Sequence, residues 1–170
     1  MLSVTLVELS HDFLNDLFRA FWKNNRTFLP DLKFFTKSLA KLQVNHEILI
    51  DHQNLYQGVL EKINDGILYS EKAATELKII FENILQYEKD LKDYLVTGNI
   101  TLKNHLLTFG TEIFNLTLHF ATEHENRLIR GICIPKASIS FVKILESQRN
   151  IIYFYNQQLK SKDHLKKALP

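Results

Sequence analysis

The stretch LKFFTKSLAKLQVNHEILIDHQNLYQGVLEKINDGI, residues 32–67, decides the fold because it carries an unbroken heptad of core-type positions. Its members alternate at spacings of three and four residues, the repeat of a helix that packs along a partner helix. About five heptads in one phase predict a single long helix over about residues 30–65. The seam consists of Leu32, Phe35, Leu39, Leu42, His46, Leu49, Gln53, Tyr56, Leu60, Ile63 and Ile67.

This regularity predicts an elongated molecule. A straight α-helix drifts away from a seven-residue repeat, so the pattern indicates a gently supercoiled partner alongside it for about 50 Å. Composition agrees: 45% of the 170 residues are hydrophobic, whereas five glycines and three prolines are too few to punctuate an all-β fold. We expect one domain, residues 1–170.

Amphipathic patterns predict further helices over about residues 4–23, 71–96, 100–130 and 137–159. We therefore expect an all-α fold, an elongated antiparallel helical bundle of coiled-coil type. Many apolar residues lie off the seams, which favours a homodimer that buries them, although the same heptads would serve a compact monomeric bundle. Two of these helices have well-defined predicted seams, which consist of Leu77, Ile80, Ile84, Tyr87, Leu91 and Tyr94 in the first and of Phe141, Leu145, Gln148, Ile152, Tyr155 and Leu159 in the second.

Cysteine usage and hydropathy favour a reducing, cytoplasmic setting. Cys133 is the only cysteine, so no intramolecular disulfide is expected. The apolar N-terminus contains Glu8 and Asp12 and lacks the basic start of a signal peptide. No run approaches the roughly 18 uncharged apolar residues that span a bilayer, so we expect any membrane contact to be peripheral.

The net charge of +2 is unevenly distributed. Residues 46–98 carry five basic and ten acidic side chains, whereas residues 99–170 carry ten basic and five acidic ones. Nucleic-acid binders have a denser basic stripe combined with groove-reading elements. We therefore expect no nucleic-acid partner.

A set of residues spread over several helices is similar to one known family. It comprises Leu17-Phe18, Pro30, Phe35, Lys41-Leu42-Gln43, Lys62 and Asp65, the stretch from Phe81 to Phe109, and Tyr153-Phe154-Tyr155-Asn156-Gln157-Gln158-Leu159. These residues resemble the inverse BAR domain (I-BAR or IMD) of the BAR superfamily, in particular the missing-in-metastasis type. The resemblance implies a dimeric BAR-like coiled coil. Family members are longer, so both arms of the distal hairpin would be shortened together, and much of the curved lipid-facing surface would be lost.

The resemblance also implies membrane contacts at the tip of that hairpin. Arg127, Arg130 and Lys136 bracket the turn predicted there. Each cation near an anionic leaflet contributes about 1 kcal/mol to binding. The alternative is that they are solvated charges at a helix end, where cations are also favourable.

The first helix is a second candidate membrane contact. Leu6, Phe13, Phe18 and Trp22 lie near one side of it and could insert shallowly at the interface, as in some family members. The alternative is packing against the bundle, which the acidic rather than basic polar side of this helix favours.

Two polar residues fall within the long seam itself. His46 and Gln53 would cost stability there but could fix the register and the number of partners. A titrating His46 would make association depend on pH between about 6 and 7.

Four potential metal ligands share one helical stripe, namely His105, Glu112, His119 and Glu123. The pair His119 and Glu123 resembles the His-x-x-x-Glu element of hemerythrins, which implies part of a di-iron centre. The rest of such a site is missing, because the predicted helix 137–159 contains no histidine and one helix cannot surround a metal. We expect polar contacts across the bundle and no cofactor.

We expect no enzyme, because the chain lacks a glycine-rich phosphate loop and a framed nucleophile or carboxylate pair. The leading hypothesis is a BAR-like dimerisation module that binds anionic phospholipid surfaces as a peripheral membrane protein and links them to cytoskeletal or trafficking partners. The alternatives are a helical protein–protein interaction scaffold without lipid binding and a degenerate hemerythrin-like metal sensor. Salt-dependent lipid binding separates the first two.

Overall fold

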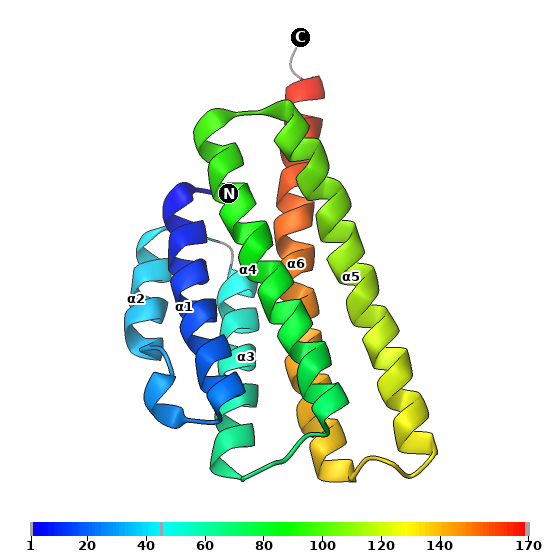
Figure 1. Cartoon of the computed structure of the whole chain (residues 1–170). Helices are drawn as coiled ribbons and strands as arrows, with labels where there is room; N and C mark the ends of the chain where they lie inside the picture. Colours follow the sequence, from blue (N-terminus) through cyan, green and yellow to red (C-terminus); the bar gives the residue numbers. More distant parts are fainter. Residues whose placement is uncertain (1, 45, 169–170) are drawn as a thin grey trace.

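The computed structural model describes residues 2–44 and 46–168, with side chains to residue 161. The described chain is all-α, with six helices in a compact antiparallel arrangement (Figure 1). The elements are α1 (Val4–Lys23), a 3-10 turn η1 (Arg26–Phe28), α2 (Leu32–Lys41), α3 (His46–Asn64), α4 (Glu71–Thr97), α5 (Ile100–Ile129) and α6 (Pro135–Ala168).

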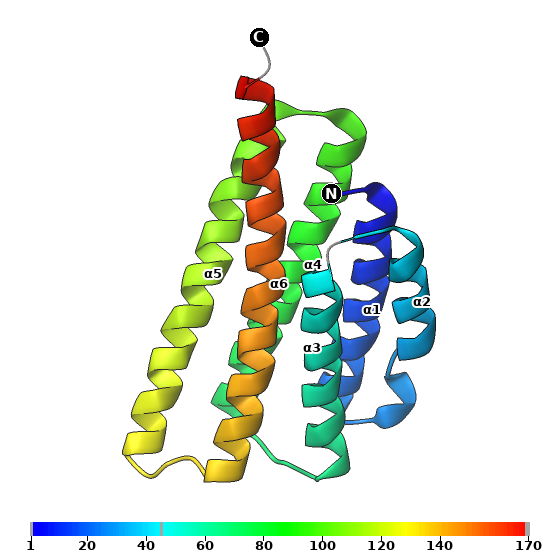
Figure 2. The ribbon, with the colours of Figure 1, turned by 180° about the vertical axis from the view of Figure 1, so that it is seen from behind.

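Each helix runs opposite to the one before it, so neighbours in sequence form hairpins. Viewed from behind, α6 lies between α5 and α3, while α1 and α2 lie at the far side of α3 (Figure 2). The α4 helix packs against α1, α5 and α6 and so forms the centre of the bundle. The connections α3–α4 and α5–α6 meet at one end, which we call the tip, and the α4–α5 turn lies at the opposite end (Figure 1).

Local sequence explains where the helices begin and end. Side chains of Ser3, Asp31 and Ser70 accept hydrogen bonds from the first turns of α1, α2 and α4. At the other ends, Asn24 and Gly98 adopt left-handed conformations that terminate α1 and α4.

The predicted continuous helix over residues 30–65 is wrong. The chain reverses direction between α2 and α3, and Gln43 adopts a left-handed conformation with φ of 52°. The heptad continues in phase across this break, so its periodicity alone does not reveal the turn. Two short antiparallel helices replace the long one, and the described fold is correspondingly more compact than the elongated coiled coil predicted.

The seams predicted for α4 and α6 are confirmed, because all twelve of their residues are buried. The seam predicted for α3 is displaced by one position. His46 is exposed and Gln53 is half-buried, so neither is the buried register-setting residue predicted. The α3 helix packs between α1 and α6, and it therefore needs core residues on more than one side. Its buried residues are Ile48, His52, Leu55, Gly58, Val59 and Lys62.

Candidate functional site

Six large aliphatic side chains are exposed at the tip of the bundle, and we call them the tip surface. They lie on the α3–α4 connection, the end of α5, the α5–α6 connection and the start of α6. Their exposed fractions range from 40% to 78%. Exposed apolar surface is typical of interaction sites, so we take these residues as the candidate site. The members are Leu68, Leu128, Ile129, Ile132, Ile134 and Ile139.

The two tip connections are short because the sequence supplies turn residues at defined places. Gly66 and Gly131 follow α3 and α5 with φ values of 61° and 70°, which L side chains rarely adopt. Pro135 opens α6, where its missing N–H costs nothing.

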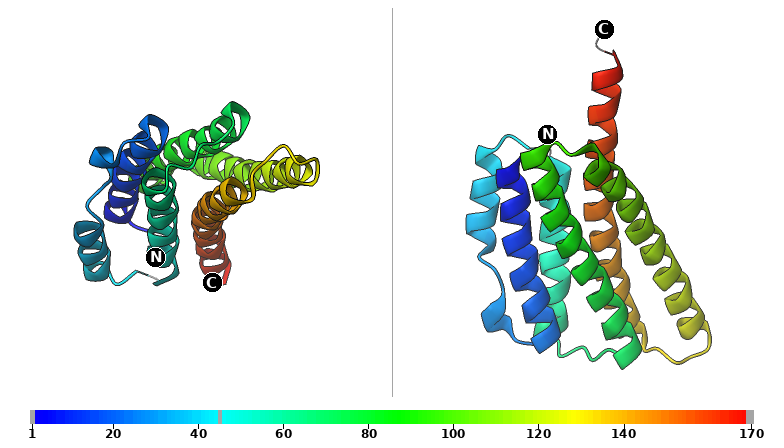
Figure 3. Two further views of the ribbon diagram at one scale, coloured as in Figure 1. Left: turned by 90° about the horizontal axis from the view of Figure 1, so that it is seen from below. Right: turned by 45° about the horizontal axis from the view of Figure 1, so that its top comes forward.

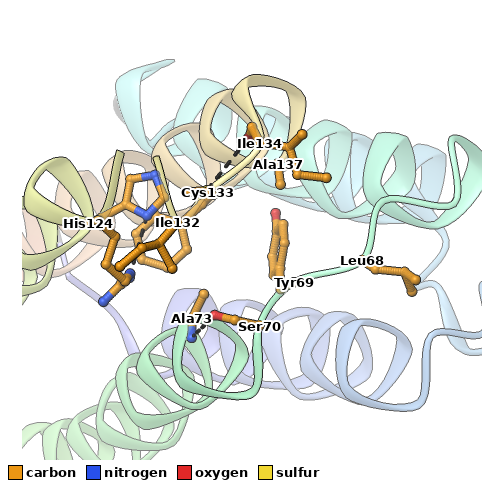
Figure 4. Close-up of a pocket in the computed structure, with 11 residues that line it drawn as sticks. Leu68, Tyr69, Ser70, Ala73, His124, Ile132, Cys133, Ile134 and Ala137 are labelled. Carbon is orange, nitrogen blue, oxygen red and sulfur yellow. Dashed lines mark hydrogen bonds between the residues drawn. The ribbon is translucent and has the colours of Figure 1, made fainter. Parts of the chain in front are cut away.

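A small cavity of about 70 Å³ lies beneath the tip surface (Figure 4). Tyr69 and Cys133 line it together with the ring of His124, which stacks on Phe141 at 4.3 Å between centroids. The Tyr69 hydroxyl is hydrogen-bonded to Ser140 and so ties the α3–α4 connection to α6. Ligand pockets for drug-sized molecules measure about 300–1,000 Å³, so this cavity is too small for one.

A chain of polar side chains joins α4, α5 and α6 below the tip. Glu76 and Arg127 form an ion pair at 2.6 Å and are mostly buried. Arg127 lies 3.4 Å from His124 Nδ1, and His124 Nε2 lies 2.7 Å from Ser138 Oγ. A guanidinium can only donate, so Nδ1 accepts and the neutral ring carries its hydrogen on Nε2, which donates to Ser138.

This tautomer prevents His124 from acting as a base toward Ser138. Burial, followed by the nearby charge of Arg127, lowers the pKa of His124 and keeps the ring neutral. A serine nucleophile would need a histidine lone pair aimed at its hydroxyl. The chain of polar groups therefore fits a structural role that fixes the tip connections in place.

The structure brings the three predicted membrane cations to the tip but in different environments. Arg127 is directed inward to Glu76, and its side chain is only 13% exposed. Arg130 is exposed. Lys136 is exposed and lies 4.0 Å from Asp65. Arg127 is thus a packing residue, and Arg130 and Lys136 are the cations that border the tip surface.

The prediction that Leu6 and Phe13 insert into a membrane is wrong, because both side chains are buried in the core. Phe13 stacks on Phe35 with 4.1 Å between ring centroids. Phe18 is half-buried against Phe81, and only Trp22 is exposed, with the Lys78 ammonium 4.4 Å from its ring centroid. The apolar side of α1 therefore packs against the bundle, which was the alternative interpretation of its pattern.

The four predicted metal candidates do not converge. His105, Glu112 and His119 are exposed along α5, and Glu123 pairs with Lys72 at 3.8 Å. Among the side chains of residues 2–44 and 46–161, no three of the His, Cys, Asp or Glu type lie in an arrangement that could hold a metal ion.

The core contains a second polar cluster that the sequence did not predict. It consists of Glu88, Tyr155, His11, Ser10 and His52, and we call it the Glu88 cluster. Tyr155 donates to Glu88 Oε2 at 2.6 Å, and His11 Nδ1 lies 3.6 Å from Glu88 Oε1. Ser10 Oγ lies 2.7 Å from His52 Nε2, and His52 Nδ1 donates to a backbone carbonyl at 2.7 Å. Burial raises the pKa of Glu88, and the neighbouring Glu88 carboxylate raises the pKa of His11.

A shallow cleft of about 430 Å³ between α1 and α4 leads to this cluster, and Glu8, Asp12, Lys89 and Lys92 form its rim. Lys92 and Glu8 are paired at 2.8 Å across it. Opposite charges on the rim neutralise one another, so the cleft does not select one ligand charge.

Within the described part of the chain, no helix combines the length and the hydropathy needed to cross a bilayer. No protein-family profile, curated protein or solved structure matches this chain.

Proposed function

We propose that this protein is a non-enzymatic, peripheral membrane module of the cytoplasm that attaches to anionic phospholipid surfaces through its tip surface. The observation that carries the proposal is the gathering of six exposed leucine and isoleucine side chains at one end of the bundle. In the same proposal, the opposite end remains available for cytoskeletal or trafficking partners.

Aliphatic side chains on short connections suit shallow insertion at a membrane interface. Fully burying one leucine or isoleucine is worth about 1.5–3 kcal/mol, so partial insertion of several would hold the tip at the surface. Arg130 and Lys136 border the patch at the level of the headgroups, where each cation adds about 1 kcal/mol on an anionic leaflet.

The assembly that we propose is a homodimer of the inverse BAR kind. Its support is a second exposed apolar area on α5 and α6, where Leu118 and Tyr153 are 43% and 52% exposed and Phe114 contacts Tyr153 at 5.8 Å between ring centroids. A second copy would cover this area. Size-exclusion chromatography with light scattering would give twice the monomer mass for the wild type and the monomer mass for Leu118→Asp/Tyr153→Asp. A monomeric wild type at all concentrations would remove the dimer from the proposal.

A protein partner at the tip is the second candidate function. It is favoured by the pairing of Arg127 with Glu76 and of Lys136 with Asp65, which leaves the patch with little net charge. Protein interfaces combine an apolar centre with a polar rim of this balanced kind.

Co-sedimentation with phosphoinositide-containing vesicles at about 50 and 300 mM salt separates the two candidates. We expect the wild type to pellet and Ile132→Asp/Ile134→Asp to stay in the supernatant. The matched control is Val96→Asp/Ile100→Asp, which places the same charges on exposed aliphatic positions at the opposite end. A wild type that stays in the supernatant at both salt concentrations would refute membrane attachment and favour the protein partner.

A further inference from the structure

The outward side of α2 carries a row of lysines that do not belong to the tip surface. Lys33, Lys37 and Lys41 are exposed and follow one another at spacings of four residues, with exposed Phe34 beside them. Such spacing places them on one side of the helix, opposite buried Phe35 and Leu39. We call Lys33, Phe34, Lys37 and Lys41 the basic face of α2.

Positive charge extends beyond this face toward the start of α2. Residues 19–41 contain six basic side chains and one acidic side chain, Asp31. The Asp31 carboxylate caps α2 by accepting from the Phe34 N–H at 3.0 Å. In the described structure, the three lysines of the basic face and the exposed Lys23 and Arg26 form no ion pair within 4.0 Å. The local charge is therefore not neutralised by neighbours.

The basic face is also unobstructed. The α2 helix is the outermost element on its side of the bundle, as the views from the front and from below show (Figures 1 and 3). Among the described elements, it packs only against α1 and α3. Its lysines therefore project from a convex ridge.

We infer that the basic face of α2 is an electrostatic docking surface for anionic phospholipid headgroups, separate from the tip surface. A short amphipathic helix with lysines on its outer side and an exposed phenylalanine among them suits a planar interface, where the ring inserts and the ammonium groups contact headgroups. Among the described residues, the basic face carries one exposed ring, Phe34, whereas proteins that hold single-stranded nucleic acid combine a basic groove with several stacking rings. The inference rests on the proposed membrane attachment and adds a second contact to it.

The test measures binding to phosphatidylserine-containing vesicles as a function of salt. Each lysine at an anionic surface is worth about fivefold in affinity, so Lys33→Gln/Lys37→Gln/Lys41→Gln should bind about 100-fold more weakly at low salt. The matched control, Lys72→Gln/Lys89→Gln/Lys160→Gln, removes three exposed lysines elsewhere and should retain nearly all binding. Equal affinity of the α2 variant and this control would overturn the inference.

The two contacts are distinguished by position-specific labels. The native Cys133 is the chain's only cysteine and carries an environment-sensitive dye at the tip, and Phe34→Cys in a Cys133→Ser chain carries it on α2. We expect both dyes to report an apolar environment when the protein is bound to vesicles. At high salt, the signal from α2 should disappear and the signal from the tip should remain. A dye response only at the tip would overturn the α2 inference and leave the tip proposal intact. A dye response only at α2 would overturn the tip proposal and leave the α2 contact intact. Binding of a single-stranded oligonucleotide without vesicle binding would overturn both lipid assignments.

Discussion

His52 shows how burial fixes the state of a single side chain. The ring is fully buried on α3, donates from Nδ1 to the Ile48 carbonyl and lies 2.7 Å from the Ser10 hydroxyl. Because a carbonyl only accepts, Nε2 keeps its lone pair for Ser10. Burial lowers the pKa of His52 from 6.5 to about 4, so the folded protein holds the neutral ring.

This shift predicts a loss of stability in acid. Below pH 6.5 the unfolded chain binds a proton at His52 that the folded chain takes up only near pH 4. The stability that the group contributes is therefore present at neutral pH and decreases by up to about 3 kcal/mol as the pH falls from about 6.5 to about 4. Urea unfolding across this range should show that His52→Gln is less stable at neutral pH but loses less on acidification. If the free energy of unfolding fell equally with pH for the two proteins, His52 would not be the group that is held neutral by burial.

Glu88 and His52 illustrate why the polar core could not be predicted. Glu88 follows the seam residue Tyr87, and in sequence a carboxylate at that position is equivalent to one on a solvated side. Its burial depends on Tyr155 from α6 and His11 from α1, which only the tertiary fold brings to it. The position of the tip could be predicted, because Gly131 and Pro135 mark its turn, but the exposure of the isoleucines there depends on how the helices pack.

The break between α2 and α3 can be tested by the sign of the change in the free energy of unfolding when Gln43 is replaced. Gln43 holds a left-handed conformation that costs an L residue about 1 kcal/mol and costs glycine little. Gln43→Gly should therefore raise the free energy of unfolding by up to about 1 kcal/mol, measured by urea denaturation. In the continuous helix predicted from the heptad, the same change would lower it by about 1 kcal/mol. Gln43→Ala, which keeps a β-carbon, should give no gain.

The close approach of α5 to α6 depends on Gly110. A β-carbon there would overlap the Asn156 amide, which accepts from Tyr87 at 3.3 Å. Gly110→Ala should therefore destabilise the protein by about 1–3 kcal/mol, even though alanine is the better helix former. Thr108→Ala on the exposed side of α5 should change stability by less than about 0.5 kcal/mol in the same assay. A stabilised Gly110→Ala would contradict this packing.

The seams of α4 and α6 could be predicted because each of these helices packs against three others and buries a broad surface that includes its heptad positions. The α3 seam could not be predicted, because the sequence of α3 offers two apolar sides, represented by Leu49 and Leu55, and the buried side is that of Leu55. Periodicity specifies which residues share a side, but the choice between two apolar sides is made by the neighbouring helices.

The overall dimensions separate the compact bundle from the elongated molecule predicted. Compact domains of 170 residues have a radius of gyration of about 16 Å. Small-angle X-ray scattering of the monomer, at concentrations below any association, should give a value close to this. A markedly larger radius for a monomer would mean that the helices separate in solution.

The position of α5 at the margin of the bundle has a consequence for hydrogen exchange. This helix of 30 residues packs against α4 and α6 and no other described element, so it should open locally more readily than α4. Its last residue, Ile129, belongs to the tip surface. A membrane or partner at the tip would give α5 a third neighbour, and its amides should then exchange more slowly over a length of about 45 Å, far from the contact itself.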